Sequence, residues 1–201
     1  MVDLSVPSVV PNWIAGTERL PLSGQTFEKF NPANGRPLCR VAQSSGEDIH
    51  EAVLSAKSAQ SGWALETVVR RGEILRAVAE LLVQHQKEIA DLVSLETGKS
   101  RKDALGETGA AIEMGFFVAG EGRRFYGKTT TSGVPGRSAM VIRQPLGVAG
   151  LIIAANTPIA NVAWKVFPAL LCGNAAVLKA SEDSPLSAWM KSLMQVISLS
   201  H

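Results

Sequence analysis

The chain has 201 residues, 46% of them hydrophobic and 19% charged, a composition typical of globular proteins and sufficient for one sizeable domain or two small ones. Its 20 lysines and arginines are scattered among 18 acidic residues and leave a formal charge of +2, so we expect no nucleic acid partner. The first residues lack a basic segment followed by an apolar run, and the longest apolar stretch, residues 148–155, is too short to span a bilayer, so we expect a soluble protein without membrane segments.

Residues 1–43 alternate between turn signals and strand signals. Short runs such as Thr26 to Phe30 suit strands. The dipeptides between such runs are typical of turns: Ala15-Gly16, Ser23-Gly24, Asn31-Pro32 and Asn34-Gly35. We predict an extended amino-terminal arm with short strands over residues 1–43.

At Ser45 the pattern changes to helical periodicity. Ser45 and Asp48 have the spacing of a capping box, in which each side chain accepts a hydrogen bond from the backbone of the other residue. Apolar residues then recur at helical spacing from Ile49 to Trp63. The sequence predicts one amphipathic helix here, the first element of a helical part that covers residues 44–125.

Two more helical stretches complete that part. One begins at about Thr67, is interrupted near His85 and ends at Gly98, so we expect two helices there. The other covers residues 103–124 and contains several glycines, which lower its helix propensity. Small residues on a helix suit close packing against another helix, and we expect that role for Gly106, Gly109, Gly115 and Gly120.

Residues 126–145 read as a β-hairpin. Thr129 to Thr131 and Ser138 to Gln144 suit strands, and Val134-Pro135-Gly136 supplies a turn between them.

Residues 146–201 have the pattern of a strand, a helix and a strand. Gly147 to Ala155 and Ala175 to Lys179 suit strands buried on both faces, Ala160 to Leu171 is helical, and Gly173-Asn174 suits a helix C-terminus. Together they predict a right-handed βαβ unit. Ser184-Pro185 then suits an N-cap followed by proline at the first helical position, opening a helix that we expect to run to the chain end.

The predicted fold class is therefore α/β. An amino-terminal arm and helices lead into the start of a Rossmann-like parallel sheet. Two parallel strands are too few for a complete doubly wound domain, whose strands need neighbours and whose faces need helices, so we expect an incomplete fold.

Polar residues follow both predicted parallel strands, at the edge where such sheets bind ligands. Asn156 follows the first strand, Lys179 closes the second, and Glu182 lies just beyond. Lys179 and Glu182 are placed to hydrogen-bond a ribose diol. Equally, Lys179 would only reach water and Glu182 would only favour a helix start.

Asn156 also has two readings. The turn from Ala154 to Pro158 has no glycine, which disfavours the usual glycine-rich approach to a pyrophosphate. In that turn Asn156 suits a turn or N-cap residue ahead of Pro158, the reading that local chemistry favours. Alternatively, its side-chain amide would donate a hydrogen bond to a developing alkoxide, as an oxyanion donor.

The sequence resembles the aldehyde dehydrogenase family over roughly residues 10–188. Residues 143–186 are similar to the family's R-x-P-x-G-V, A-W-K-x-x-P-A-L-x-x-G-N and K-P-S-E-x-x-P segments, with alanine replacing proline in the last. Earlier landmarks occur in the same order: Asn31-Pro32-Ala33, Ala56 to Trp63, Arg71 to Leu82 and Leu95-Glu96-Thr97-Gly98-Lys99. Several short motifs in order are far more specific than any one of them.

The resemblance implies a function and a set of site residues. It implies a portion of an oxidoreductase that oxidises an aldehyde to a carboxylic acid with NAD or NADP. Asn156 would be the oxyanion-hole asparagine and Lys165 a lysine of the proton pathway, for which a solvated helix position is an equal alternative. The implied cofactor-binding residues are Ile152, Ile153, Ala155, Lys179, Ser181 and Glu182. Ala155 and Thr157 stand where the family usually has aromatic residues, which leaves the substrate wall undefined.

The family's mechanism also needs a nucleophilic cysteine and a glutamate base. The two cysteines, Cys39 and Cys172, have no CxxC or Cys/His spacing, so we expect neither a disulfide framework nor a metal site, and a reducing cytoplasm fits them. Cys172, at a helix end, suits an inert core cysteine. We therefore expect a chain truncated before the catalytic cysteine and inactive alone.

A second hypothesis comes from a different class of function. The hairpin and the glycine-rich helix would serve a non-catalytic interaction module or pseudoenzyme derived from the family, since family members use such a hairpin in oligomerisation. On either hypothesis the resemblance implies a homo-oligomer.

Overall fold

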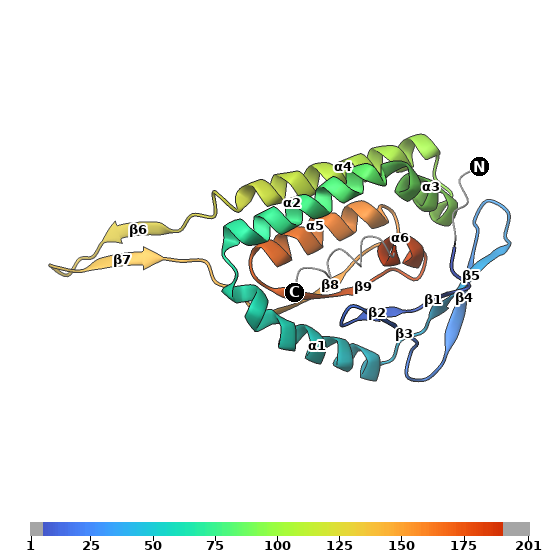
Figure 1. Cartoon of the computed structure of the whole chain (residues 1–201), viewed down its shortest axis with the longest axis horizontal. Helices are drawn as coiled ribbons and strands as arrows, with labels where there is room; N and C mark the ends of the chain where they lie inside the picture. The colour runs from blue at the N-terminus through green and yellow to red at the C-terminus, as the bar shows by residue number, and fades with distance from the viewer. Residues whose placement is uncertain (1–5, 191–201) are drawn as a thin grey trace.

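The computed structural model describes residues 6–190, in which an arm of short strands precedes four helices, a hairpin and a βαβ unit (Figure 1). The strands are β1 (Val9–Val10), β2 (Asn12–Ile14), β3 (Thr17–Arg19), β4 (Thr26–Phe30), β5 (Pro37–Ala42), β6 (Lys128–Thr131), β7 (Ser138–Val141), β8 (Val148–Ile152) and β9 (Ala175–Lys179). The helices are α1 (Gly46–Leu65), α2 (Val68–Gln84), α3 (Gln86–Thr97), α4 (Arg101–Glu121), α5 (Pro158–Leu171) and α6 (Pro185–Trp189).

The predicted arm is present as two small sheets. β5 lies between β1, which is parallel to it, and β4, which is antiparallel. β2 and β3 form a hairpin, and Ala15 and Gly16 between them both have positive φ, at 53° and 73°. Two consecutive residues with positive φ form the kind of turn whose twist matches a two-residue hairpin.

The capping box that opens α1 is confirmed, and it also ties α1 to the arm. The Asp48 carboxylate accepts a hydrogen bond from Ser45 N over 2.7 Å, and the Ser45 side chain accepts one from the backbone of the first turn. The other Asp48 oxygen accepts from Leu22 N over 2.8 Å. These backbone donors lower the pKa of Asp48, because they favour the charged carboxylate.

The helix boundaries after α1 follow the predicted signals closely. α2 and α3 meet at His85, and α3 ends at Gly98, whose φ of +75° is the left-handed conformation expected at a helix C-terminus. α4 begins two residues earlier than predicted, because the Ser100 side chain accepts a hydrogen bond from Asp103 N and caps the helix there.

Only part of the predicted close packing by glycines is observed. At Gly115 an added Cβ would lie 2.9 Å from Ala79 and 3.1 Å from Phe167, so this glycine lets α4 approach both α2 and α5. Gly106 has nothing within 4 Å of such a Cβ. Gly109 and Gly120 would meet only the ends of flexible side chains.

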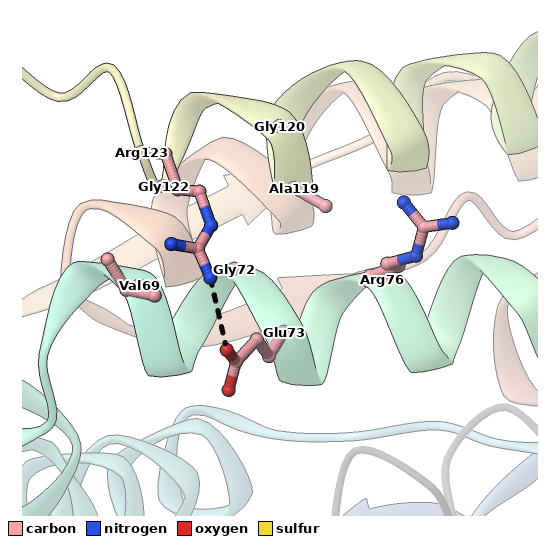
Figure 2. Close-up of a pocket in the computed structure, with 8 residues that line it drawn as sticks. All are labelled: Val69, Gly72, Glu73, Arg76, Ala119, Gly120, Gly122 and Arg123. Carbon is pink, nitrogen blue, oxygen red and sulfur yellow. Dashed lines mark ion pairs between the residues drawn. The ribbon is translucent and has the colours of Figure 1, made fainter.

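Two other glycines make the closest crossing of α2 and α4, beside a shallow pocket (Figure 2). A Cβ at Gly72 would lie 2.7 Å from Ala119 O, and one at Gly122 would lie 2.9 Å from Val68 O. The ion pair between Glu73 of α2 and Arg123, which follows the end of α4, joins these segments at 3.7 Å on the exposed side.

The main core lies among α2, α4 and α5, with the βαβ sheet beneath α5 and α1 on the opposite side of that sheet (Figure 1). Trp63 of α1 donates its indole N–H to Leu170 O over 2.8 Å. The buried Arg71 side chain donates to Leu171 O and Glu66 O, so the corner between α1 and α2 is fixed to the end of α5. The apolar side chains that fill this core include Leu75, Val78, Ile89, Val93, Ile112, Ile159, Val162 and Phe167.

The predicted hairpin is present as β6 and β7, and the residues of both strands are exposed. It projects away from the rest of the chain (Figure 1). Its return to the body is fixed by Asn174, whose side-chain oxygen accepts hydrogen bonds from Leu146 N and Gly147 N. The hairpin's use in assembly stays a prediction.

The βαβ unit is present, but its strands differ from the prediction. β8 and β9 are parallel, with Val148 opposite Ala175. β8 ends at Ile152 rather than Ala155, and neither strand is buried on both faces: Ile152 is 67% exposed. The described sheet has these two strands, and a groove lined by the arm, α1, α5 and β9 remains open beside it.

The last described helix is α6, which begins at Pro185 as predicted. The predicted continuation of this helix to the chain end falls on residues 191–201, which lie outside the described residues. Among residues 6–190 no helix is long and apolar enough to cross a membrane.

Candidate functional site

The carboxyl ends of β8 and β9 lie at one edge of the sheet, where the sequence placed its polar residues. Ile152 at the end of β8 stands opposite Lys179 at the end of β9. Asn156 lies in the turn between β8 and α5, and Glu182 in the turn between β9 and α6.

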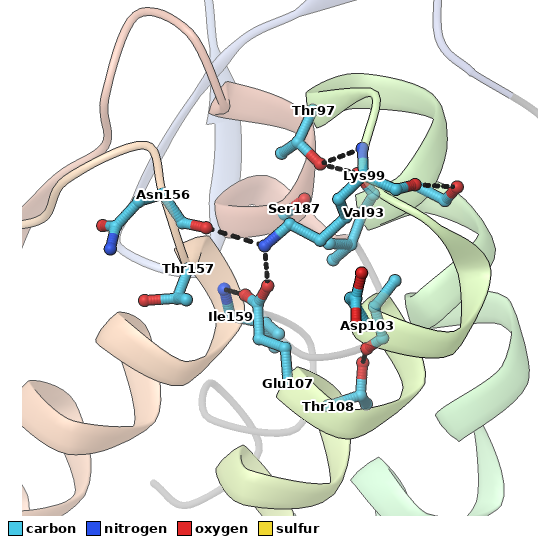
Figure 3. A network of polar contacts seen from close by, with 12 residues as sticks. Val93, Thr97, Lys99, Asp103, Glu107, Thr108, Asn156, Thr157, Ile159 and Ser187 are labelled. Carbon is cyan, nitrogen blue, oxygen red and sulfur yellow. Dashed lines mark hydrogen bonds and ion pairs between the residues drawn. The ribbon is translucent and has the colours of Figure 1, made fainter.

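Asn156 is exposed, and its side chain does not cap α5. The N-cap residue is Thr157, followed by Pro158 at the first helical position, and the Thr157 side chain makes no capping hydrogen bond either. Within residues 6–190 the Asn156 side-chain amide has no hydrogen-bonding partner, and it points away from the polar contacts around its backbone (Figure 3). The N-cap interpretation of Asn156 is therefore wrong, and it remains a turn residue with an unused amide.

The N-terminus of α5 is capped instead by Glu107 of α4. Because Pro158 has no N–H, Ile159 supplies the first backbone donor of the helix, and it donates to Glu107 Oε1 over 2.9 Å. The Glu107 side chain is only 3% exposed. A negative charge at this position also interacts favourably with the helix dipole.

Lys99, from the loop between α3 and α4, completes this network (Figure 3). Its ammonium donates to Glu107 Oε2 over 2.5 Å and to the Asn156 backbone oxygen over 2.7 Å. The turn that carries Asn156 is thus held at both ends, by Lys99 at its carbonyl and by Glu107 at the helix start.

Glu96 of α3 has the same role at the next turn. Leu186 N donates to one of its oxygens over 2.5 Å, and Ser187 N and Oγ donate to the other over 2.9 and 2.5 Å. The predicted N-cap, Ser184, stands at the right position, but its side chain makes no capping bond, because Glu96 already accepts the first N–H groups. Burial raises the pKa of Glu96, although its hydrogen bonds act in the opposite direction.

Lys179 and Glu182 lie together at the exposed mouth of this edge. Their side chains form an ion pair at 3.3 Å and both face solvent. The hydrogen bond from the Glu182 backbone N–H and the Lys179 ammonium lower the pKa of Glu182, so it stays ionised. Ser181 is buried, and its hydroxyl accepts a hydrogen bond from Asp183 N, which shapes the turn.

The remaining predicted site residues differ in their exposure to solvent. The side chain of Ile152 is exposed and Ala155 is half-buried, but Ile153 is 4% exposed and packs in the core, so only its backbone can face a ligand. Lys165 is exposed on α5, well along the helix from Asn156, and the structure does not bring it into the network of Lys99 and Glu107.

The two thiols lie in different environments, and that of Cys39 does not suit a nucleophile. Cys39 is buried, and burial together with the nearby Glu96 charge raises its pKa to about 11. Cys172 is half-buried at the C-terminal end of α5. In the part of the chain that the structure describes, no three His, Cys, Asp or Glu side chains are grouped to hold a metal ion.

Sequence reasoning missed Lys99, Glu107 and the capping role of Glu96. Lys99 and Glu96 both stand in the Leu-Glu-Thr-Gly-Lys segment, which was noticed only as a landmark. Glu107 offers no local signal, because its partner Ile159 is 52 residues away.

Comparison with known proteins identifies the family of the chain. Residues 21–197 match the model of the aldehyde dehydrogenase family. The chain belongs to this family. Three helices that carry the network, α3, α4 and α5, all lie within the matched residues.

Among curated family members, the chain is 41% identical over 176 residues to 3,6-anhydro-alpha-L-galactose dehydrogenase of Streptomyces coelicolor, covering 88% of this chain and 36% of that protein. It is 40% identical over 177 residues to malonate-semialdehyde dehydrogenase 2 of Geobacillus kaustophilus, covering 88% of this chain and 37% of that protein. The chain thus spans less than two fifths of the length of these relatives.

Solved structures show the same fold. A variant of aldehyde dehydrogenase from Bacillus cereus superposes with a TM-score of 0.91 at 30% identity, covering 97% of this chain and 41% of that chain. An NADP-dependent enzyme from E. coli gives 0.90 at 32% identity, covering 94% and 39%. A 3,6-anhydro-L-galactose dehydrogenase in complex with NAP gives 0.89 at 27%, covering 94% and 40%.

Proposed function

We propose that this chain is the amino-terminal portion of an enzyme that oxidises an aldehyde to a carboxylic acid with NAD(P)+. Family membership and the relatives, which include malonate-semialdehyde dehydrogenase and 3,6-anhydro-alpha-L-galactose dehydrogenase, support this reaction class. The chain contributes one wall of the cofactor cleft and one donor to the substrate oxygen.

The observation that carries this proposal is the state of Asn156. Its backbone is held by Lys99, while its side-chain amide, at the carboxyl edge of the sheet, has no partner within residues 6–190. A fixed backbone with an unused amide N–H suits a donor to an oxygen that becomes negatively charged as a nucleophile adds to the aldehyde carbon. Asn156 is therefore assigned as the oxyanion donor.

Lys179 and Glu182 fit the ribose of a dinucleotide. An exposed ammonium and an ionised carboxylate, 3.3 Å apart, can together hydrogen-bond a diol at the strand end. The Ile152 side chain and the backbones of Ile153 and Ala155 would line the same cleft. Bound NAD(P)+ would supply the hydride acceptor.

Two further assignments complete the proposal. Cys39 is buried with a raised pKa, and Cys172 stands at the opposite end of α5 from Asn156, so the chain alone is expected to be inactive. Lys165 is assigned to proton movement only on its sequence match, and its exposed position is equally that of a solvated lysine. We expect a cytoplasmic location.

Paired steady-state kinetics test the assignments in an active enzyme that carries this segment. Asn156→Ala should lower kcat by about a hundredfold or more while leaving the KM for NAD(P)+ nearly unchanged, because the amide acts chiefly on the transition state. Lys179→Ala should raise the KM for NAD(P)+ with a smaller effect on kcat, because a ribose contact is made in both states. If Asn156→Ala leaves kcat within about twofold of wild type, the oxyanion role is wrong.

A second function, assembly, is favoured by the hairpin of β6 and β7. It projects from the body and exposes large apolar side chains: Val134, Met140, Val141 and Ile142. Two-stranded hairpins are marginal alone, so a partner that covers this face would stabilise it. We propose a second copy of the chain as that partner, and replacing Met140 and Ile142 with serine should then shift sedimentation toward the monomer.

A further inference from the structure

The turn from Ala154 to Pro158 is held by contacts from the helix that follows it and by one contact from a distant loop. It contains no glycine, and neither Asn156 nor Thr157 caps the helix that follows. The Asn161 side-chain amide donates to Thr157 Oγ1 over 3.2 Å and to Ala154 O over 3.4 Å. The shortest contact to the turn comes from outside it, from the Lys99 ammonium to the Asn156 carbonyl oxygen at 2.7 Å.

Lys99 is itself held firmly by its own loop. Gly98 before it has φ of +75°, and a Cβ there would lie 3.0 Å from the Pro32 side chain, so the loop passes close against the arm. Ser94 Oγ donates to Lys99 O over 2.8 Å. The base of the lysine side chain is thus fixed by α3 and the arm, independently of α5.

The Lys99 ammonium is also held in a defined position, because it lies in a partly buried ion pair. The Lys99 side chain is 19% exposed and its carboxylate partner Glu107 only 3%. In such a partly desolvated place an ion pair with charge-assisted hydrogen bonds is stronger and better oriented than a surface pair. The ammonium has two acceptors, one on α4 and one on the turn, so it joins the helix α4 to the residue that carries the free amide.

We propose that Lys99 is a positioning residue for Asn156, an inference that rests on the oxyanion role proposed above. Holding the Asn156 carbonyl fixes the peptide plane that follows the residue, and with Ala154 O held by Asn161 on the preceding side it restricts the direction of the Asn156 Cα–Cβ bond. Glu107, the partner of Lys99 in the ion pair, accepts a hydrogen bond from Ile159 N and so holds the chain just after the turn. Lys99 touches neither substrate nor cofactor in this scheme and acts only through the orientation of the amide.

The test is a double-mutant cycle in an active enzyme that carries this segment. Lys99→Met removes the ammonium but keeps much of the side-chain volume, and Lys99→Arg keeps donors that can serve both acceptors. We expect Lys99→Met to lower kcat by about tenfold to a hundredfold, the scale of a small misplacement of a reacting group, and to leave the KM for NAD(P)+ within about twofold. Lys99→Arg should recover most of the loss. The matched control, Lys102→Met on the exposed surface of α4, should have no effect.

The decisive comparison is made in the Asn156→Ala background. If Lys99 acts through Asn156, Lys99→Met should lower kcat no further there. A full, additive loss in that background, or no loss in the wild type, overturns the inference while the oxyanion role stands. A wild-type kcat in Asn156→Ala alone instead overturns the proposed function. Should Lys99→Met not fold, Glu107→Gln, which weakens the same ion pair, must show the same non-additivity with Asn156→Ala, and additivity would again overturn the inference.

Discussion

Two sets of helices in this chain satisfy their first backbone N–H groups in different ways. α1, α2 and α4 begin with local caps, in which the side chains of Ser45, Thr67 and Ser100 accept hydrogen bonds from the first turn. α5 and α6 begin with proline at the first position and an N-cap residue whose side chain makes no capping hydrogen bond. Their first N–H groups donate to Glu107 and Glu96, which belong to α4 and α3.

The difference coincides with the position of the candidate site. The two helices with remote caps, α5 and α6, are the ones that start directly after β8 and β9, at the carboxyl edge of the sheet. A remote cap fixes a helix start without using the polar side chains of the turn before it. The side-chain amide of Asn156 is therefore left free to contact a ligand, on a turn that is nevertheless held in place.

Among the local and remote caps, we expect the largest loss of stability when the remote cap Glu96 is removed. Glu96→Ala leaves two backbone N–H groups buried without an acceptor and should cost about 3 kcal/mol or more of unfolding free energy. Glu96→Gln retains one acceptor oxygen and should cost less. Chemical denaturation of the three proteins measures both, and equal stabilities would show that the remote cap is unimportant.

The pH dependence of Glu96→Gln has a definite sign. The pKa of Glu96 is raised in the folded protein, so its favourable contribution is complete below the unfolded value of about 4.3 and is lost as pH rises through the folded value. The glutamine variant should therefore gain stability relative to wild type as pH rises from about 4 toward neutral. A relative loss over that range would contradict the assigned shift.

Removing Asp48, which belongs to the local cap of α1, should lower stability by a smaller amount and with the opposite pH dependence. Asp48 accepts from Ser45 N and Leu22 N, so Asp48→Ala should cost about 2 kcal/mol at neutral pH. Because the pKa of Asp48 is lowered, this contribution is present above the unfolded value of about 3.9 and is lost as pH falls through the folded value. Denaturation at neutral and acidic pH checks whether the difference from wild type narrows in acid.

The smallest changes in stability are expected for the two N-cap serines, of which Ser45 makes a capping hydrogen bond and Ser184 does not. Ser45→Ala should cost about 1 kcal/mol, because its hydroxyl caps α1. Ser184→Ala should change stability by less than about 0.5 kcal/mol or raise it, because the buried Ser184 hydroxyl has no hydrogen-bonding partner among the described residues. Thermal unfolding of the pair measures the contrast, which disappears if Ser184 caps α6 in solution.

The same comparison explains what the sequence could predict. Caps formed within one turn leave a short motif, and the sequence predicts the capping box of α1 and the stop at Gly98 from such motifs. A cap supplied from another helix leaves none. Glu96 and Glu107 lie 90 and 52 residues from the backbone groups they hold, so only the folded chain brings each pair together.

The errors over the parallel strands have a related cause. An apolar run predicts burial on average, but the exposure of each strand depends on its neighbours in the sheet, which no short segment records. Ile152 and Ile153 are adjacent and equally apolar, yet one is exposed and the other lies in the core. The polar positions at the strand ends were predicted because that edge follows from strand direction alone.

Hydrogen exchange at the Ile159 amide tests the central claim most directly, namely that Glu107 holds the start of α5 and leaves Asn156 free. In Glu107→Ala, exchange of this amide should accelerate by about tenfold or more, the value of a lost charge-assisted hydrogen bond. In Asn156→Ala it should stay within about twofold of wild type. If Asn156→Ala accelerates exchange at Ile159 as much as Glu107→Ala does, Asn156 is a structural residue of the turn and the account is contradicted.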